Sequence, residues 1–180
     1  MAKNPYREDY RLTEHFDEKG RVHTTSEYIG KKYRFSEDAA VISFEKKKEA
    51  LLAAAGWLCF LAALWQENAA MHHLYIALPF AFTALPLALY THTAAVFCGM
   101  KEPLEHRHAE RMNHSFPPAA LAVMLFSLFS LAGELLGYIT EKEQFSTTGD
   151  LFFTAGAFGL FLVGVFAFKA RKKVTIVPEG

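Results

Sequence analysis

Four long stretches that are nearly free of charge constrain this chain more than any other feature. A bilayer core about 30 Å thick needs roughly 20 apolar residues of helix, and each stretch approaches or reaches that length. A soluble helix carries a polar stripe on one face, which residues 151–168 lack. A chain of 180 residues cannot bury four such helices in its own interior. The sequence therefore predicts membrane spans at 50–66, 74–99, 116–139 and 151–168.

The lysines and arginines near the ends of these stretches predict the orientation. Ten of them would lie on one side of the membrane, whereas the loops on the other side hold only Lys142. The ten are Lys46, Lys47, Lys48, Lys101, Arg107, Arg111, Lys169, Arg171, Lys172 and Lys173. Because basic residues favour the cytoplasmic side, we expect both termini and the middle loop to be cytoplasmic. Residues 2–48 are polar, so we expect no cleaved signal peptide and a multi-pass protein of the bacterial inner (plasma) membrane.

Residues 1–48 form the predicted cytoplasmic N-terminal segment, ahead of the bundle at 49–168 and a tail at 169–180. β-Branched and aromatic residues between turn residues predict a small antiparallel meander within 10–36. Its strands are expected at 10–16, 21–29 and 32–36, with a turn at 17–20. Three short strands are marginal alone, so we expect them to lean on the membrane, on the middle loop or on a partner. A mostly unstructured tail is the alternative.

A helix is predicted from Ser36 to Lys48, where helix-starting residues lead into mixed apolar and charged positions. We interpret it as an interfacial helix leading into the first span. The run at 174–177 is expected to add an edge strand to the meander. The fold class is thus an all-α membrane protein, a four-helix transmembrane bundle with a small N-terminal β-meander or extended segment.

Glu134 is the only acidic residue within the predicted spans. An ionised carboxylate at membrane depth is costly, so it marks either a functional site or a hydrogen-bonded packing residue. His72, His73 and Glu67 would lie at a similar depth, and imidazole with carboxylate suits zinc, nickel or manganese. These four residues form the candidate divalent-metal site. Histidines that only prefer the headgroup zone are the simpler interpretation. No other cofactor is expected.

Small residues indicate close helix packing. Gly133 and Gly137 have the GxxxG spacing that lets a second helix approach, and Gly156 and Gly159 mark a similar face in the last span. Lipid does not require small side chains, whereas neighbouring helices do. Part of this surface is therefore expected to serve either this chain or a partner subunit.

No phosphate-binding loop, dinucleotide fingerprint, zinc-protease helix, nucleophile elbow or CxxC motif occurs in the sequence. A formal net charge of zero argues against nucleic-acid binding. We therefore expect a non-catalytic accessory or assembly subunit of a larger membrane complex, such as a transporter or signalling complex. It would contact the lipid bilayer and either another membrane protein or a second copy. The alternative is a small transporter or ion-binding protein that uses Glu134 and the histidines, and a membrane enzyme is the third hypothesis.

Overall fold

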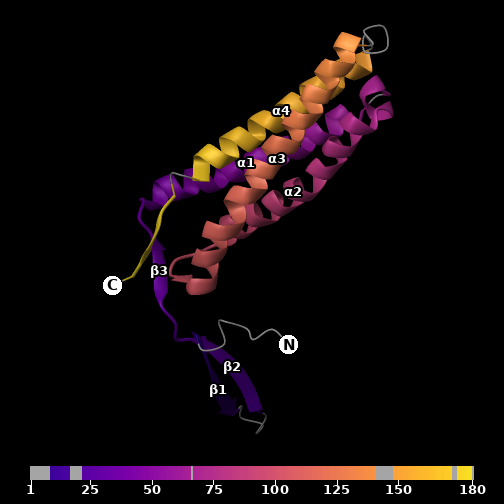
Figure 1. Ribbon diagram of the computed structural model, residues 1–180. Helices are drawn as coiled ribbons and strands as arrows, with labels where there is room; N and C mark the ends of the chain where they lie inside the picture. The colour runs from indigo at the N-terminus through magenta and orange to yellow at the C-terminus, as the bar shows by residue number, and fades with distance from the viewer. Residues whose placement is uncertain (1–8, 17–21, 66, 141–147, 172–173, 180) are drawn as a thin grey trace.

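The computed structural model describes residues 9–16, 22–65, 67–140, 148–171 and 174–179. It is mostly helical, with four long helices and a small region of strands at one end (Figure 1). The helices are α1 (Ala39–Ala63), α2 (Leu74–Gly99), α3 (His106–Thr140) and α4 (Thr148–Arg171), with a short 3-10 helix η2 (Ala69–His72) before α2. The strands are β1 (Tyr10–Phe16), β2 (Val22–Tyr28), β3 (Lys32–Phe35), β4 (Leu104–Glu105) and β5 (Ile176–Pro178).

The four helices run side by side as an elongated bundle (Figure 1). α2 packs on α3, α3 on α4, α4 on α1 and α1 on α2, which closes a ring of four contacts. Aromatic rings fill the centre: Phe80 stacks on Phe60 at 4.9 Å between centroids and lies equally close to Phe153. Pro79 and Pro86 lie within α2, and the carbonyl of Pro79 accepts a hydrogen bond from the Thr83 hydroxyl. The bundle thus has its own apolar core.

Three of the four helices are long and apolar enough to cross a membrane: α2, Pro118–Thr140 of α3, and Thr148–Ala170 of α4. Only 33% to 39% of their apolar windows is buried inside the protein, so most of these side chains are at least partly exposed. An apolar exterior of this kind is what hydrocarbon requires. Within the described residues, α1 is not apolar enough over a sufficient length to cross a membrane. Its first half carries the charged run Glu45–Glu49, and the helix ends at Ala63.

The predicted interfacial helix and first span form one continuous helix. α1 begins at Ala39 and shows no break at Lys48, where the two were expected to meet. Its last helical residue is Ala63 and not Gln66, which shortens the uncharged part to 50–63. At 1.5 Å per residue that part is about 21 Å long, less than a full bilayer core.

The predicted three-stranded meander is wrong in its pairing, although strands form near all three predicted positions. β1 and β2 make an antiparallel hairpin, with Tyr10 opposite Tyr28. β3 pairs instead with β4 and β5, in the order β4-β3-β5. The backbone N–H groups of Ile29 and Gly30 both donate to the carbonyl of Asp9, which turns the chain away from β2 before β3 begins. The predicted turn at 17–20 lies outside the described residues.

The three-stranded sheet is attached to the end of the bundle that we call the sheet end. A second apolar cluster joins them, made by Phe35, Ile42, Phe97, Met100, Leu104 and Val174. Lys46 reinforces it, because its Nζ donates to the carbonyl of Met100 at 2.5 Å and lies over the rings of Phe35 and Phe97. The pairing of β5 with β3 places the C-terminal strand at the same end of the bundle as the N-terminal strands.

Candidate functional site

Glu134 lies inside the helix bundle, near the end opposite the sheet. Its side chain is 7% exposed, and its Oε1 accepts a hydrogen bond from the Thr154 hydroxyl of α4 at 2.6 Å. The same hydroxyl lies 2.9 Å from the backbone carbonyl of Asp150, whose own carboxylate is close enough to act electrostatically on Glu134. Glu134 therefore sits in a polar contact between α3 and α4.

The predicted metal ligands do not come together around Glu134. His72 and Glu67 are exposed, while His73 follows η2 as its C-cap, with its ring centroid 5.4 Å from that of Tyr75. In the described part of the chain no three His, Cys, Asp or Glu side chains are placed to hold a metal ion. The reason is local: Glu134 points inward to α4, whereas His72 points to the surface from a short turn.

The polar region around Glu134 extends into the connection between α1 and α2. The Asp150 carboxylate accepts from the backbone N–H of Ala69 at 2.8 Å, and Asn68 accepts from the N–H of Met71 at 3.0 Å. Asn68 and Asp150 are 5% and 4% exposed. Gly149 lies directly against the backbone of Glu67, so α4 begins in contact with this connection. These side chains fix the ends of three helices.

The predicted packing glycines lie at contacts within this chain. A Cβ added at Gly156 would lie 2.5 Å from the carbonyl oxygen of Cys59, and one at Gly159 would meet the Cys59 sulfur. Gly133 faces Tyr75 and Ile76 of α2, and Gly137 is buried. Gly156 and Gly159 of α4 therefore serve the contact with α1.

A second buried polar group, at the sheet end, was missed by sequence reasoning. Glu49 of α1 is 3% exposed and accepts a hydrogen bond from the Tyr90 hydroxyl of α2 at 2.5 Å. Glu45, one turn earlier, is 4% exposed and pairs with Lys48 at 3.2 Å. The sequence did carry a signal, since Ile42, Glu45, Glu49 and Ala53 share the spacing of one helix face.

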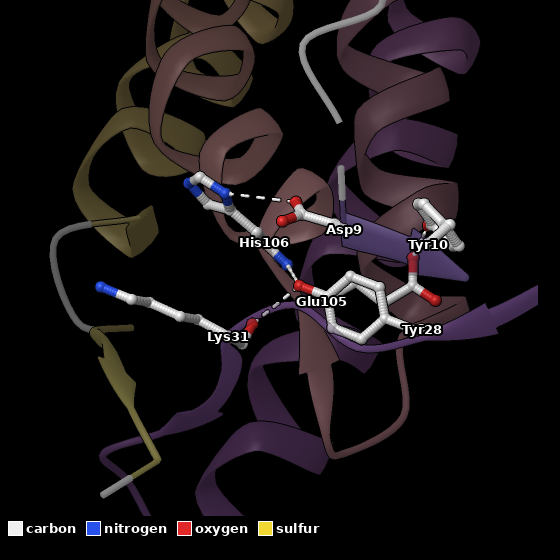
Figure 2. A network of polar contacts seen from close by, with 6 residues as sticks. All are labelled: Asp9, Tyr10, Tyr28, Lys31, Glu105 and His106. Atoms are coloured by element: carbon white, nitrogen blue, oxygen red, sulfur yellow. Dashed lines mark hydrogen bonds and ion pairs between the residues drawn. The ribbon is translucent and has the colours of Figure 1, made fainter. Parts of the chain in front are cut away.

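The hairpin is held to the start of α3 by the network of polar contacts in Figure 2. The Tyr28 hydroxyl accepts from the backbone N–H of His106 at 2.9 Å and donates to the carbonyl of Lys31 at 2.8 Å. The Tyr10 hydroxyl donates to Glu105 at 2.5 Å, and His106 lies 3.7 Å from the Asp9 carboxylate. We call these six residues the hairpin latch.

The electrostatics of the latch keep the Tyr28 hydroxyl protonated. Partial burial raises the pKa of Tyr28, the His106 N–H opposes this, and the charges of Asp9 and Glu105 add to the rise. A protonated hydroxyl can donate and accept at the same time, as the two contacts of Tyr28 require. The rings of Tyr10 and Tyr28 also meet edge to face at 5.3 Å. The latch thus couples the hairpin to both β4 and the first residue of α3.

No protein-family model, curated protein or solved structure matches this chain.

Proposed function

We propose that the protein is a non-catalytic accessory or assembly subunit of a larger membrane complex, of the transporter or signalling kind, and that the β1–β2 hairpin binds the partner. One observation carries the proposal. The hairpin stands away from the bundle (Figure 1), Leu12 and Val22 on it are 71% and 53% exposed, and Ile29 directly after β2 is 49% exposed. Apolar side chains of this size gathered on one small exposed element favour a protein contact.

The backbone of the hairpin supports the same proposal. Among the described residues β1 and β2 pair only with each other, so each strand has one edge available to another strand. A two-stranded hairpin is marginally stable in water, and an added strand from a partner would stabilise it. The latch holds the hairpin at a fixed place beside α3, which lowers the entropy that a partner must remove on binding.

The membrane supplies the other half of the proposal. α2, α3 and α4 would cross it fully, and α1 would make a fourth, shorter crossing with its lysines at the headgroups. The paired strands β3 and β5 lie at the sheet end, which also carries exposed Lys47, Lys101 and Lys169. We propose that this end is cytoplasmic, in a bacterial inner membrane. Lys142, Lys172 and Lys173, which entered the sequence prediction, lie outside the described residues.

Site-specific photo-crosslinking in native membranes tests the proposal. A crosslinking amino acid at position 12 should give one dominant adduct with another membrane protein, identified by mass spectrometry after purification in mild detergent. Position 136 provides the control, because Leu136 is 59% exposed but lies at the opposite end of the bundle. A Val22→Glu change should abolish the adduct at position 12 and leave the protein folded. Adducts with a second copy only, or none, would overturn the proposal.

A small transporter or ion-binding protein that uses Glu134 is the second candidate. The observation that favours it is the burial of two carboxyl side chains, Glu134 and Asp150, at one helix contact. Glu134→Gln should then abolish cation or proton flux into liposomes while partner crosslinking is unchanged. If flux is absent from the wild-type protein, or is equal in wild type and variant, this candidate fails.

A further inference from the structure

A cavity of about 340 Å³ lies at the sheet end, where β3 leads into α1. Its volume is within the range of roughly 300–1,000 Å³ that small-molecule sites occupy. Phe35, the first two turns of α1 and the chain after α2 line it. Since α2 ends at Gly99, the apolar length of that helix stops beside this cavity. In the proposed membrane placement the cavity is therefore at the level of the lipid headgroups.

The lining combines an apolar floor with charges of both signs. Phe35, Ile42 and Met100 form the floor. Two cations, Lys46 and Lys101, and two carboxylates, Glu37 and Glu102, surround it together with the hydroxyl of Ser43. A purely anionic ligand would meet two carboxylates, and a purely cationic one would meet two lysines. The charges fit a ligand that carries both signs.

The charged groups keep hydrogen-bonding capacity for such a ligand. Lys46 Nζ uses one of its three donors on the carbonyl of Met100, which leaves two. The exposed side chain of Lys101 has no hydrogen bond or ion pair within the described part of the chain, which leaves three. Glu102 accepts from the backbone N–H of Phe35 through Oε1, so its Oε2 remains available.

Glu37 stays ionised in this setting. Burial alone would raise the pKa of Glu37, but hydrogen bonds from the Ser36 hydroxyl and from the backbone N–H of Thr175 outweigh it and lower that pKa. Each oxygen of a carboxylate has two lone pairs, so Glu37 can still accept from a ligand. The cavity lining therefore includes a negative charge as well as its lysines at neutral pH.

We propose that this cavity binds the headgroup of a phospholipid that carries a primary ammonium, as phosphatidylethanolamine does. The phosphate is held by Lys46, Lys101 and Ser43, and the ammonium by Glu37 and Glu102. Charge-assisted hydrogen bonds of this kind are stronger than neutral ones. The apolar floor contacts the glycerol and the first part of the acyl chains. This lipid site is independent of the partner contact through the hairpin.

Native mass spectrometry of the full chain in detergent with added lipid tests the proposal. Phosphatidylethanolamine should remain bound more strongly than phosphatidylglycerol, which lacks the ammonium, and phosphatidylcholine, whose methylated ammonium cannot donate. Lys101→Ala should weaken retention on the order of fivefold, the effect of about 1 kcal/mol per lysine. Lys47→Ala is the matched control, because Lys47 is exposed on α1 but does not line the cavity.

Three results would overturn the proposal. The first is equal retention of the three lipids, and the second is an equal loss in the Lys101 and Lys47 variants. The third is binding of soluble phosphoethanolamine, measured by ligand-observed NMR, without any preference among lipids, which would assign the cavity to a soluble ligand. Glu102→Gln provides an independent check, since it should reduce the preference for phosphatidylethanolamine over phosphatidylglycerol while keeping an acceptor for the N–H of Phe35.

Discussion

Replacing Gly156 with alanine should separate α4 from α1. The added Cβ would lie 2.5 Å from the carbonyl oxygen of Cys59 and 2.9 Å from the backbone nitrogen of Ala63. Ordinary contacts of carbon are about 3.5–4.0 Å, so the helices must move apart by about 1 Å. Backbone atoms cannot rotate out of the way as a side chain can. Overpacking of this kind costs about 1–3 kcal/mol, and the better helix propensity of alanine returns up to about 1 kcal/mol.

We therefore expect Gly156→Ala to lower the free energy of unfolding by about 1–2 kcal/mol. The chain's two cysteines, Cys59 and Cys98, are both partly buried, so labelling by a thiol-reactive dye during SDS titration reports unfolding. Gly99→Ala is the control, since nothing lies within 4 Å of a Cβ there. It should leave stability unchanged or raise it slightly. A Gly156 variant as stable as wild type would show that α1 and α4 are not in this close contact.

Three further changes test other contacts. Tyr90→Phe removes a donor from the buried Glu49 carboxylate and should cost about 1–3 kcal/mol in the same SDS titration; an unchanged midpoint would contradict the buried pair. Tyr28→Phe opens the latch and should speed hydrogen exchange at the His106 amide without affecting the far ends of the helices. Hydrogen bonds lower the pKa of Glu37 in the folded state. Its contribution to the stability of the β5 attachment is therefore complete above the unfolded pKa near 4.5 and is lost as pH falls through the lower folded-state pKa. Glu37→Gln should remove this acid sensitivity of hydrogen exchange in β5, and a variant that keeps the sensitivity would refute the assignment.

The helices could be predicted because hydrophobic runs are local information. The run at 74–99 and helix α2 have the same bounds. α3 begins at His106, ten residues before the apolar run at 116. An apolar run marks the part of a helix suited to hydrocarbon, whereas the helix itself continues through polar residues for as long as its backbone hydrogen bonds are favourable. The ends of the runs therefore predicted the ends of α2 but not those of α1, α3 and α4.

The strand pairing could not be predicted from the same kind of information. β3 pairs with β4 and β5, which lie about 70 and 140 residues further along the chain. β4 has only two residues, Leu104 and Glu105, and two residues carry no alternating pattern. The pairing depends on where the helices return the chain, and so it follows from the bundle and not from the strands. The expected edge strand at 174–177 did form, as β5, but its partner β3 belongs to a different sheet from the hairpin.

Only one of the buried carboxylates was predicted from the sequence, because composition does not show which face of a helix is buried. Glu134 stood out because it is one acid in an apolar run, and it is indeed buried. Glu45 and Glu49 are buried as deeply, but they lie beside lysines at the end of the predicted interfacial helix and were not singled out. Composition averages over all faces of a helix, whereas burial depends on one face. A carboxylate on the inner face can be satisfied by one neighbour, as Glu49 is by Tyr90.

The burial of a single helix face explains how α1 can belong to the bundle although its composition differs from that of α2, α3 and α4. Lys47 and the two glutamates lie on different faces of α1: Lys47 is exposed, while Glu45 and Glu49 are buried. The cost of placing a carboxylate away from water is offset where a protein donor meets it. The inner face of α1 therefore needs no headgroup or water to satisfy its acids, and Lys47 on its outer face is the group that limits how deep α1 can lie. The depth of α1 in a bilayer should accordingly shift inward when Lys47 is replaced with leucine, and should not shift when Glu45 is replaced with glutamine.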